Sequence, residues 1–125
     1  MRTVRLLLLL ALLVGCGSPR PAWVQTDLYF GLARADGGVV QPEEFQAFLD
    51  EAATPRFPDG LTVLEARGQW RSHGRVLREP ARVLVVLHPP GPEADAALES
   101  IRADYRRRFA QESVLRVDRA VDASF

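Results

Sequence analysis

Few residues of this chain have the types and spacing that catalysis or metal binding requires. The 125 residues include one cysteine, Cys16, and two histidines, His73 and His88. Because the two histidines fall in segments expected at opposite ends of the fold, a transition-metal site would need mostly carboxylates. Ser113 follows Glu112, but no histidine is predicted near it to act as the base for nucleophilic catalysis. These residues indicate no metal site and no cofactor, and they leave open whether the chain is an enzyme.

One loop, residues 54–60, combines rigid prolines with two opposite charges, Arg56 and Asp59. We expect this loop to lie beside Asp27 and His88. A structural turn, in which Arg56 pairs with Asp59 or Asp27, is the simpler interpretation. A binding site for a small anionic group is the alternative, because a guanidinium can hold such a group with two hydrogen bonds.

The second candidate site is a sheet face that the predicted helices leave uncovered. Residues predicted to point outward on three strands are polar or ionisable, whereas the central strand adds apolar residues beside them. An uncovered face of this mixed kind binds a partner or meets its own copy. The candidate ligand or interface residues on it are Tyr29, Glu65, Arg67, Gln69, Arg116 and Asp118.

Length and charge restrict the classes of protein that fit. A chain of 125 residues has room for one domain. Its 16 basic and 16 acidic residues balance, and removal of Arg2 and Arg5 with a leader would leave 14 against 16. A net charge near −2 argues against a nucleic-acid partner.

The amino terminus has the pattern of an export signal. Arg2 and Arg5 precede an apolar run of nine residues, 6–14, which is too short for a bilayer core that needs roughly 20 residues. The run leads into Leu13-Val14-Gly15-Cys16, which resembles the lipobox of bacterial lipoproteins. The resemblance implies cleavage after residue 15 and a lipid on Cys16 with fatty acids such as palmitate. An ordinary secretory signal with a chance cysteine is the alternative.

A lipid on Cys16 would tether the mature protein to a membrane, since two or three acyl chains anchor it durably. Residues 16–22 form a short linker to the domain. Gly17, in place of aspartate after the cysteine, resembles lipoproteins sorted to the outer membrane. We therefore predict a location in the cell envelope, facing the periplasm if the host has two membranes. With no second cysteine, the folded part has no internal disulfide.

Hydrophobic periodicity predicts four strands and two helices in residues 23–125. Alternation predicts strands at 27–32, 62–71, 82–87 and 114–121, and the third is apolar on both faces, which is typical of a central strand. Proline and carboxylates predict helices that begin at Pro42 and near Glu93. We expect the following side chains to point inward from the sheet: Leu28, Phe30, Leu32, Leu64, Ala66, Gly68, Trp70, Leu115 and Val117.

The order strand, helix, strand, strand, helix, strand predicts an α+β fold, a ferredoxin-like two-layer sandwich with strands one and three in the centre. This topology brings the start of strand one, residues 54–60 and residues 88–93 to one end. Residues 34–41, 72–80 and 111–113 meet at the other end. Because the linker enters strand one, we expect the first end to face the membrane.

Three segments together resemble the family known as domain of unknown function 3574, which comprises small bacterial secreted proteins. They are residues 26–31 (TDLYFG), residues 54–64 (TPRFPDGLTVL) with 68–71 (GQWR), and residues 111–117 (QESVLRV). The family often ends in Cys-x-Ser-Phe, whereas Asp122 occupies that cysteine position here. The resemblance implies one domain over the mature chain and brings no established activity.

Two functional hypotheses follow. The first is an envelope lipoprotein that binds a partner or its own copy, as a homodimer, through the open sheet face. The second is a small cofactor-free enzyme that resembles the dimeric α+β barrel proteins, with Tyr29, Arg67 or His88 as acid-base or anion-holding groups.

Overall fold

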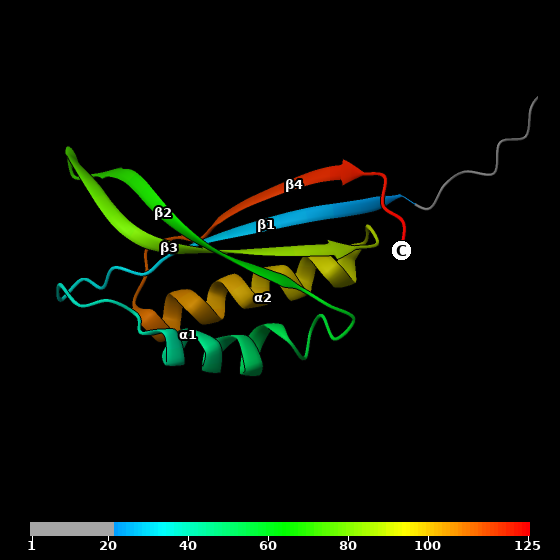
Figure 1. Ribbon diagram of the computed structural model, residues 1–125, viewed down its shortest axis with the longest axis horizontal. Coiled ribbons are helices and arrows are strands. Elements are labelled where there is room, and N and C mark those ends of the chain that lie inside the picture. Colours follow the sequence, from blue (N-terminus) through cyan, green and yellow to red (C-terminus); the bar gives the residue numbers. More distant parts are fainter. Residues whose placement is uncertain (1–21) are drawn as a thin grey trace, which may run out of the picture.

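The computed structural model describes residues 22–125, so the predicted leader and Cys16 lie outside the described residues. Four antiparallel strands form one sheet in the order β2-β3-β1-β4, and the helices cover one of its faces (Figure 1). This is the predicted ferredoxin-like α+β arrangement, with the first and third strands in the centre. The elements are β1 (Trp23–Gly31), α1 (Pro42–Phe48) with the π-helical turn η1 (Leu49–Ala53), β2 (Thr62–Ser72), β3 (Arg75–His88), α2 (Pro92–Phe109) and β4 (Leu115–Val121).

Both helices begin as the sequence predicts. Pro42 and Pro92 occupy first-turn positions, where a missing N–H costs nothing, and carboxylates follow near the positive end of each helix dipole. The Glu44 carboxylate also accepts a hydrogen bond from the Gln41 backbone N–H at 2.9 Å. The long helix α2 ends at Phe109, and the left-handed conformation of the next residue, Ala110 (φ 51°), turns the chain toward β4.

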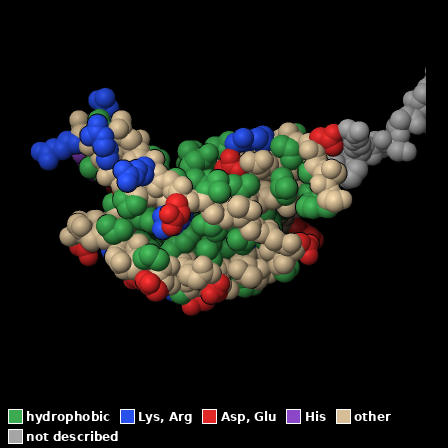
Figure 2. Space-filling view, viewed as in Figure 1, with side chains coloured by type: hydrophobic (Ala, Val, Ile, Leu, Met, Phe, Trp, Pro, Cys, Tyr) green, Lys and Arg blue, Asp and Glu red, His purple; other side chains and the backbone are tan. Residues whose placement is uncertain are grey.

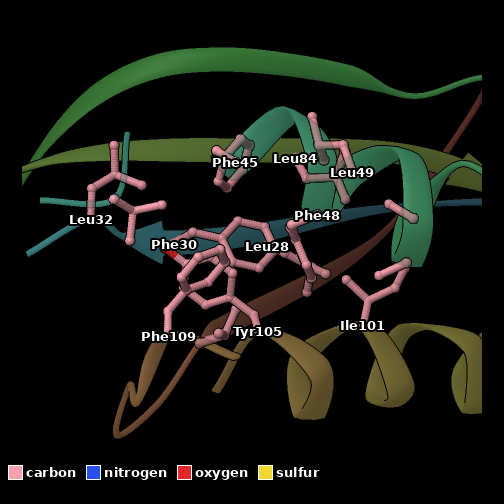
Figure 3. Packing of buried hydrophobic residues seen from close by; sticks show 14 of the residues in the cluster. Leu28, Phe30, Leu32, Phe45, Phe48, Leu49, Leu84, Ile101, Tyr105 and Phe109 are labelled. Carbon is pink, nitrogen blue, oxygen red and sulfur yellow. The ribbon is translucent and has the colours of Figure 1, made fainter. Parts of the chain in front are cut away.

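The core lies between the sheet and the two helices (Figure 3). At its centre, the rings of Phe30 and Tyr105 meet edge to face with 4.6 Å between centroids, and those of Phe48 and Tyr105 with 5.1 Å. Such pairs add to the free energy of burial. Tyr105 is fully buried, and its hydroxyl donates a hydrogen bond to the Gly31 carbonyl at 2.7 Å. Other core side chains are Leu28, Leu32, Phe45, Leu49, Leu84, Val86, Leu98, Ile101 and Phe109.

The two edge strands present the opposite faces from those predicted. Leu28 pairs with Leu84 and Leu84 with Val63, so Val63 points toward the helices and packs against the core. Leu64 and Leu115 are instead 50% and 53% exposed on the other side. The prediction that Leu64, Ala66, Gly68, Trp70, Leu115 and Val117 point inward was therefore wrong.

The physical reason is that side chains alternate with a period of two, so a change of one residue exchanges the faces of a strand. On β2 only Val63 packs against the core, together with Phe57 and Leu61 of the preceding loop. The alternate positions further along this edge strand are exposed and carry the polar residues Glu65, Arg67 and Gln69. Polar residues therefore lie on the helix side of β2 at positions that do not join the core.

The β2–β3 hairpin continues beyond the rest of the sheet. The last β1–β3 pair is Gly31 with Ala81, whereas six further β2–β3 pairs extend to Ser72 and Arg75. We call residues 67–80 the ribbon. His73 and Gly74 form its turn with positive φ values of 47° and 77°, as the right-handed twist of a tight hairpin requires. The ribbon curls away from the helices (Figure 1).

Among residues 22–125, no helix is long and apolar enough to cross a membrane.

Candidate functional site

A groove of about 590 Å³ lies on the uncovered side of the sheet, where the ribbon leaves it. Tyr29 and Leu115 line it from the sheet, and Trp70 and Leu77 line it from the ribbon. Residues 110–113, which connect α2 to β4, complete the wall. The predicted meeting of this loop, the hairpin and residues 34–41 at one end is confirmed, because Arg34, His73 and Gln111 line the same groove.

Glu79 is the central polar residue of the groove. Its carboxylate accepts the Ala33 backbone N–H at 2.7 Å and the indole N–H of Trp70. A Cβ on Gly31 would lie 2.7 Å from Oε1 of Glu79, so the carboxylate occupies space that only a glycine leaves. Gly68 plays the same part for the Trp70 ring, which lies where its Cβ would be. Two glycines inside strands thus make room for the two polar groups of the groove.

Tyr105 supports this site from below. Burial raises the pKa of its hydroxyl well above the ordinary value, and the nearby negative charge of Glu79 raises it further. The hydroxyl therefore stays protonated and continues to donate to the Gly31 carbonyl. This bond fixes the backbone over which the Glu79 carboxylate sits.

A second set of polar residues lies at the other end of β1 and β3. Oγ1 of Thr26 is 2.8 Å from Nε2 of His88, and the Thr26 hydroxyl donates to Oδ1 of Asp118 at 2.6 Å. The other ring nitrogen of His88 is 2.8 Å from the Pro89 carbonyl. Thr26 and His88 are 0% and 5% exposed, and the Phe57 ring covers the imidazole at 6.1 Å. We call Thr26, His88 and Asp118 the buried network, in which Thr26 and His88 are buried and Asp118 forms the exposed edge.

Charges at the edge of this network are balanced. Burial alone would raise the pKa of Asp118, but hydrogen bonds from Thr26 and Arg116 outweigh that effect and hold it below its ordinary value. Arg116 contacts Asp95 at 2.6 Å, Glu99 at 2.8 Å and Asp118 at 3.0 Å. Burial opposes the charge of Arg116, yet the three carboxylates raise its pKa. Arg116 therefore ties β4 to α2 on the helix side.

The structure separates the residues that the sequence singled out. Tyr29 lines the groove, whereas Glu65 lies on the helix side and pairs with Arg82 at 3.3 Å. Arg67 and Gln69 share the helix side of β2, and Arg116 and Asp118 share that of β4. The expectation that these five residues and Tyr29 form one open face was wrong, because both edge strands are inverted relative to it.

The loop of residues 54–60 lies at the end predicted for it, since Phe57 contacts His88. The predicted partners of Arg56 were wrong, however. Its guanidinium donates to the Ala52 carbonyl at 2.7 Å and lies 3.6 Å from Asp104. Asp59 is exposed, and its segment is a turn. These contacts fit the structural interpretation of the loop.

The open face, on the side away from the helices, is largely apolar. Among the described residues, this face has one ion pair, in which Asp27 contacts Arg119 at 2.6 Å. Asp27 is only 5% exposed. Leu64 and Leu115 lie at the two ends of one row across the sheet, with Val83 and Tyr29 between them, and Leu87, which is 38% exposed, lies four residues from this row along β3. By strand register the same face also carries Tyr29, Ala66, Trp70, Leu77, Ala81, Val83, Val85 and Val117.

Arginines are distributed unevenly over the surface (Figure 2). Most of those on the helices and the sheet contact a carboxylate, as Arg34 does with Glu44 at 2.6 Å and Arg108 with Glu51 at 2.6 Å. No acidic side chain lies within ion-pair distance of the ribbon arginines in residues 22–125. These are Arg67, Arg71, Arg75 and Arg78, and the last donates to the Gln69 amide oxygen.

Sequence reasoning missed Glu79 and Trp70 as parts of a site. The available signal was the pair of glycines inside the strands, Gly31 and Gly68, because a glycine in a strand often marks the close approach of another group. The described residues contain no group of three or more histidine, cysteine or acidic side chains placed to hold a metal ion.

Comparisons with known proteins agree on fold and family. A family model described as "Protein of unknown function (DUF3574)" matches residues 25–125. No curated protein matches the chain. Among solved structures, a phage SAM lyase in complex with S-methyl-5'-thioadenosine is similar, with a TM-score of 0.63 and 14% identity over 81% of this chain and 90% of that one. CutA from Synechococcus elongatus PCC7942 is also similar, with a TM-score of 0.55 and 10% identity over 83% and 80%. At these identities the likeness is one of fold.

Proposed function

The chain belongs to the DUF3574 family, and on that premise we propose that it is a lipid-anchored envelope domain that associates with a second copy of itself through the open face. The observation that carries this proposal is the exposure of Leu64, Leu87 and Leu115 on one face of the sheet, which also carries apolar strand residues between them such as Val83 and Val85. Contiguous apolar surface of this kind marks interaction sites on soluble domains.

The open face has little net charge. This favours association with a second copy over association with a partner that is recognised by its charge. Asp27 and Arg119 neutralise each other across the β1–β4 pair, and Asp27 is almost fully buried by this contact. A face with little charge at its centre resembles the core of a homodimer interface. A two-fold axis would set the same leucines against each other without opposing like charges.

The size of the open face is sufficient. Four strands about 4.8 Å apart and about eight residues long span roughly 500 Å². The ribbon adds roughly 200 Å² on the same side by the same spacing. A standard interface buries about 800 Å² per partner, and the corrugated side-chain surface exceeds its flat projection. An isolated two-stranded ribbon is also marginal in water, so contact with a second copy would stabilise it.

The predicted lipid on Cys16 supports association further. Copies held on one membrane surface have a raised effective concentration, so a modest interface suffices. Because β1 begins at Trp23, the short linker holds that end of the domain near the bilayer. The ribbon then points away from the anchor.

Photo-crosslinking in cells tests the interface with the full chain. Benzoylphenylalanine replaces Leu64 or Leu115 in a strain that carries two differently tagged copies. We expect a product with the mass of two chains that contains both tags. The matched control replaces Gln46 on the exposed side of α1 and gives no such product. Equal yields from Gln46 and Leu64, or no yield from either leucine, would contradict the proposal.

The anchor is tested separately by growth with labelled palmitate. Label should enter the full chain and be absent from the Cys16→Ser variant, in which cleavage before residue 16 also fails. Label in the variant, or a wild type that is cleaved but carries no label, would contradict lipidation of Cys16. The amino terminus would then act as an ordinary secretory signal.

A second candidate is a small enzyme that acts in the groove. The groove volume of about 590 Å³ favours it, because small-molecule sites commonly have this size. Since one similar fold is a SAM lyase, incubation with S-adenosylmethionine followed by chromatography for S-methyl-5'-thioadenosine is the direct assay. Absence of product would remove this reaction from consideration.

A further inference from the structure

Glu79 differs from the other carboxylates that line or underlie the sheet. Asp118 contacts Arg116, and Asp27 contacts Arg119. No basic side chain forms an ion pair with Glu79 within residues 22–125, although its side chain is partly buried. Its two observed partners, Ala33 N–H and the Trp70 indole, are both neutral donors.

The carboxylate has acceptor capacity to spare. Two carboxylate oxygens offer about four lone-pair positions, and the two N–H donors occupy one on each oxygen. The remaining positions border the groove that Glu79 lines. A charge-assisted hydrogen bond to a cation is roughly twice as strong as one to a neutral donor.

The walls beside Glu79 are apolar and aromatic. Tyr29 and Leu115 lie on the sheet side, and Trp70 and Leu77 lie on the ribbon side. Aromatic faces attract cations through their quadrupoles, and leucines suit the carbon skeleton that carries the charge. The groove can therefore receive a cationic group and an apolar body together.

The other charges around the groove favour the same sign of ligand. Arg34 lines it but is engaged by Glu44 at 2.6 Å. The remaining charged side chains are Glu112 and Arg71, one of each sign, with His73 near the ribbon turn. An anion in the groove would therefore be repelled by the negative charge of Glu79. Among the described residues that line the groove, only Arg71 has no ion pair and could offset this repulsion.

From these observations we propose that the groove binds a small organic cation, a primary ammonium or guanidinium on an aromatic or apolar body, with Glu79 as its counter-charge. All the residues involved belong to one copy of the chain. Because Tyr29, Trp70, Leu77 and Leu115 belong to both the groove and the open face, a second copy seated on that face would compete with the cation.

Three probes that share one ring test the proposal. Tryptamine is the cation, tryptophol replaces the ammonium with a hydroxyl, and indole-3-propionate is the anion. Each is titrated calorimetrically into the full, lipidated chain in nonionic detergent, with empty micelles as the blank. We expect tryptamine to bind at least tenfold more tightly than tryptophol and indole-3-propionate to bind weakest. Equal affinity for all three, a preference for the anion, or no binding of tryptamine would overturn the proposal.

Matched variants locate the site. Glu79→Gln should weaken tryptamine binding at least tenfold, whereas Glu112→Gln on the groove wall should change it less than threefold. Equal effects from the two variants would overturn the assignment to Glu79. If Glu79→Gln fails to fold by circular dichroism, Tyr29→Leu gives the second test, and it should reduce the preference for tryptamine over tryptophol. Leu64→Asp disrupts the proposed interface at a residue outside the groove, so tryptamine affinity should stay the same or rise, and a loss of more than threefold would overturn the placement of the site.

Discussion

Two polar sites occupy opposite ends of the same central strands, and they differ in how fully the chain itself satisfies them. In the buried network, Thr26 contacts both His88 and Asp118, and the second ring nitrogen of the histidine lies 2.8 Å from the Pro89 carbonyl oxygen. At the other end, Glu79 has two neutral donors and faces open volume. The first site is complete without a ligand, whereas the second has capacity left for one.

This difference separates a structural role from a binding role for residues of similar chemistry. A buried histidine is a natural candidate for catalysis because imidazole can titrate near neutral pH. His88, however, is 5% exposed, and both of its ring nitrogens already have partners. We therefore interpret the buried network as a clamp that joins β1, β3 and β4, and we expect mutations there to affect stability first.

The largest expected effect is at the buried network. His88→Ala removes a buried ring and leaves Thr26 and Pro89 without its nitrogens, so we expect it to lower the free energy of unfolding by about 2–4 kcal/mol. Urea denaturation followed by circular dichroism measures this. Glu112→Ala, on the exposed groove wall, should stay within about 0.5 kcal/mol of the wild type. If the His88→Ala protein is as stable as this control, the buried network does not have the structural role that we assign to it in contrast to the groove.

The next effect is expected at Gly31 in the groove. In Gly31→Ala the new Cβ would lie 2.7 Å from the Glu79 carboxylate, which must move, so we expect a loss of about 1–3 kcal/mol. The same displacement should weaken tryptamine binding. Gly38→Ala in an exposed turn is the matched substitution, because its Cβ would come no closer than 3.1 Å to Oδ1 of the exposed Asp36, with Cδ of Arg34 at 3.5 Å. If both variants keep full stability and affinity, Gly31 does not position Glu79.

A smaller effect is expected where the core supports the groove. Tyr105→Phe keeps the ring but removes the hydrogen bond to the Gly31 carbonyl, which should cost about 0.5–1.5 kcal/mol. Thermal denaturation detects such a change, and Tyr29→Phe serves as the control because no hydrogen bond holds its hydroxyl in the described structure. Equal melting temperatures for the two variants would show that the Tyr105 bond contributes nothing.

The smallest effect concerns acid pH. Because the folded pKa of Asp118 lies below its ordinary value, its contribution is present above the unfolded pKa of about 3.9 and is lost as the pH falls through the folded value. Glu99 acts in the same direction through Arg116 and Arg102. Unfolding free energies measured from pH 5 to pH 2 should therefore fall less steeply for Asp118→Asn than for the wild type. Parallel curves would mean that Asp118 does not contribute to the acid sensitivity.

Much of the fold could be predicted because local signals and topology agree. Leu28 and Phe30 alternate with Tyr29, and the structure places the first two at 0% exposure. The doubly apolar stretch around Leu84 and Val86 identified the central position of β3. The first helix start followed from Pro42 and its carboxylates, and the second from Glu93 and Asp95 after a break at residues 89–92, one residue beyond the observed start at Pro92.

The faces of the edge strands could not be predicted from one strand at a time. On β4, Arg116 points toward the helices because α2 presents Asp95 and Glu99 to it, and alternation alone shows no such partner. Leu115 is left outside as a consequence. The groove was missed for a related reason, since Trp70 and Glu79 are neighbours only through the register of the β2–β3 hairpin, in which Gly68 pairs with Glu79.

The separation of charge described above gives the neutral chain an electric dipole. The ribbon carries four arginines without acidic partners among the described residues, whereas the carboxylates of Glu43 on α1 and Asp50 on η1 have no ion pair with a basic side chain there. In the field of a charged surface the molecule would turn its ribbon toward negative charge before any contact forms. Because the Debye length is about 10 Å at 0.1 M salt, this orienting torque acts only over the last few water layers and weakens as salt is added.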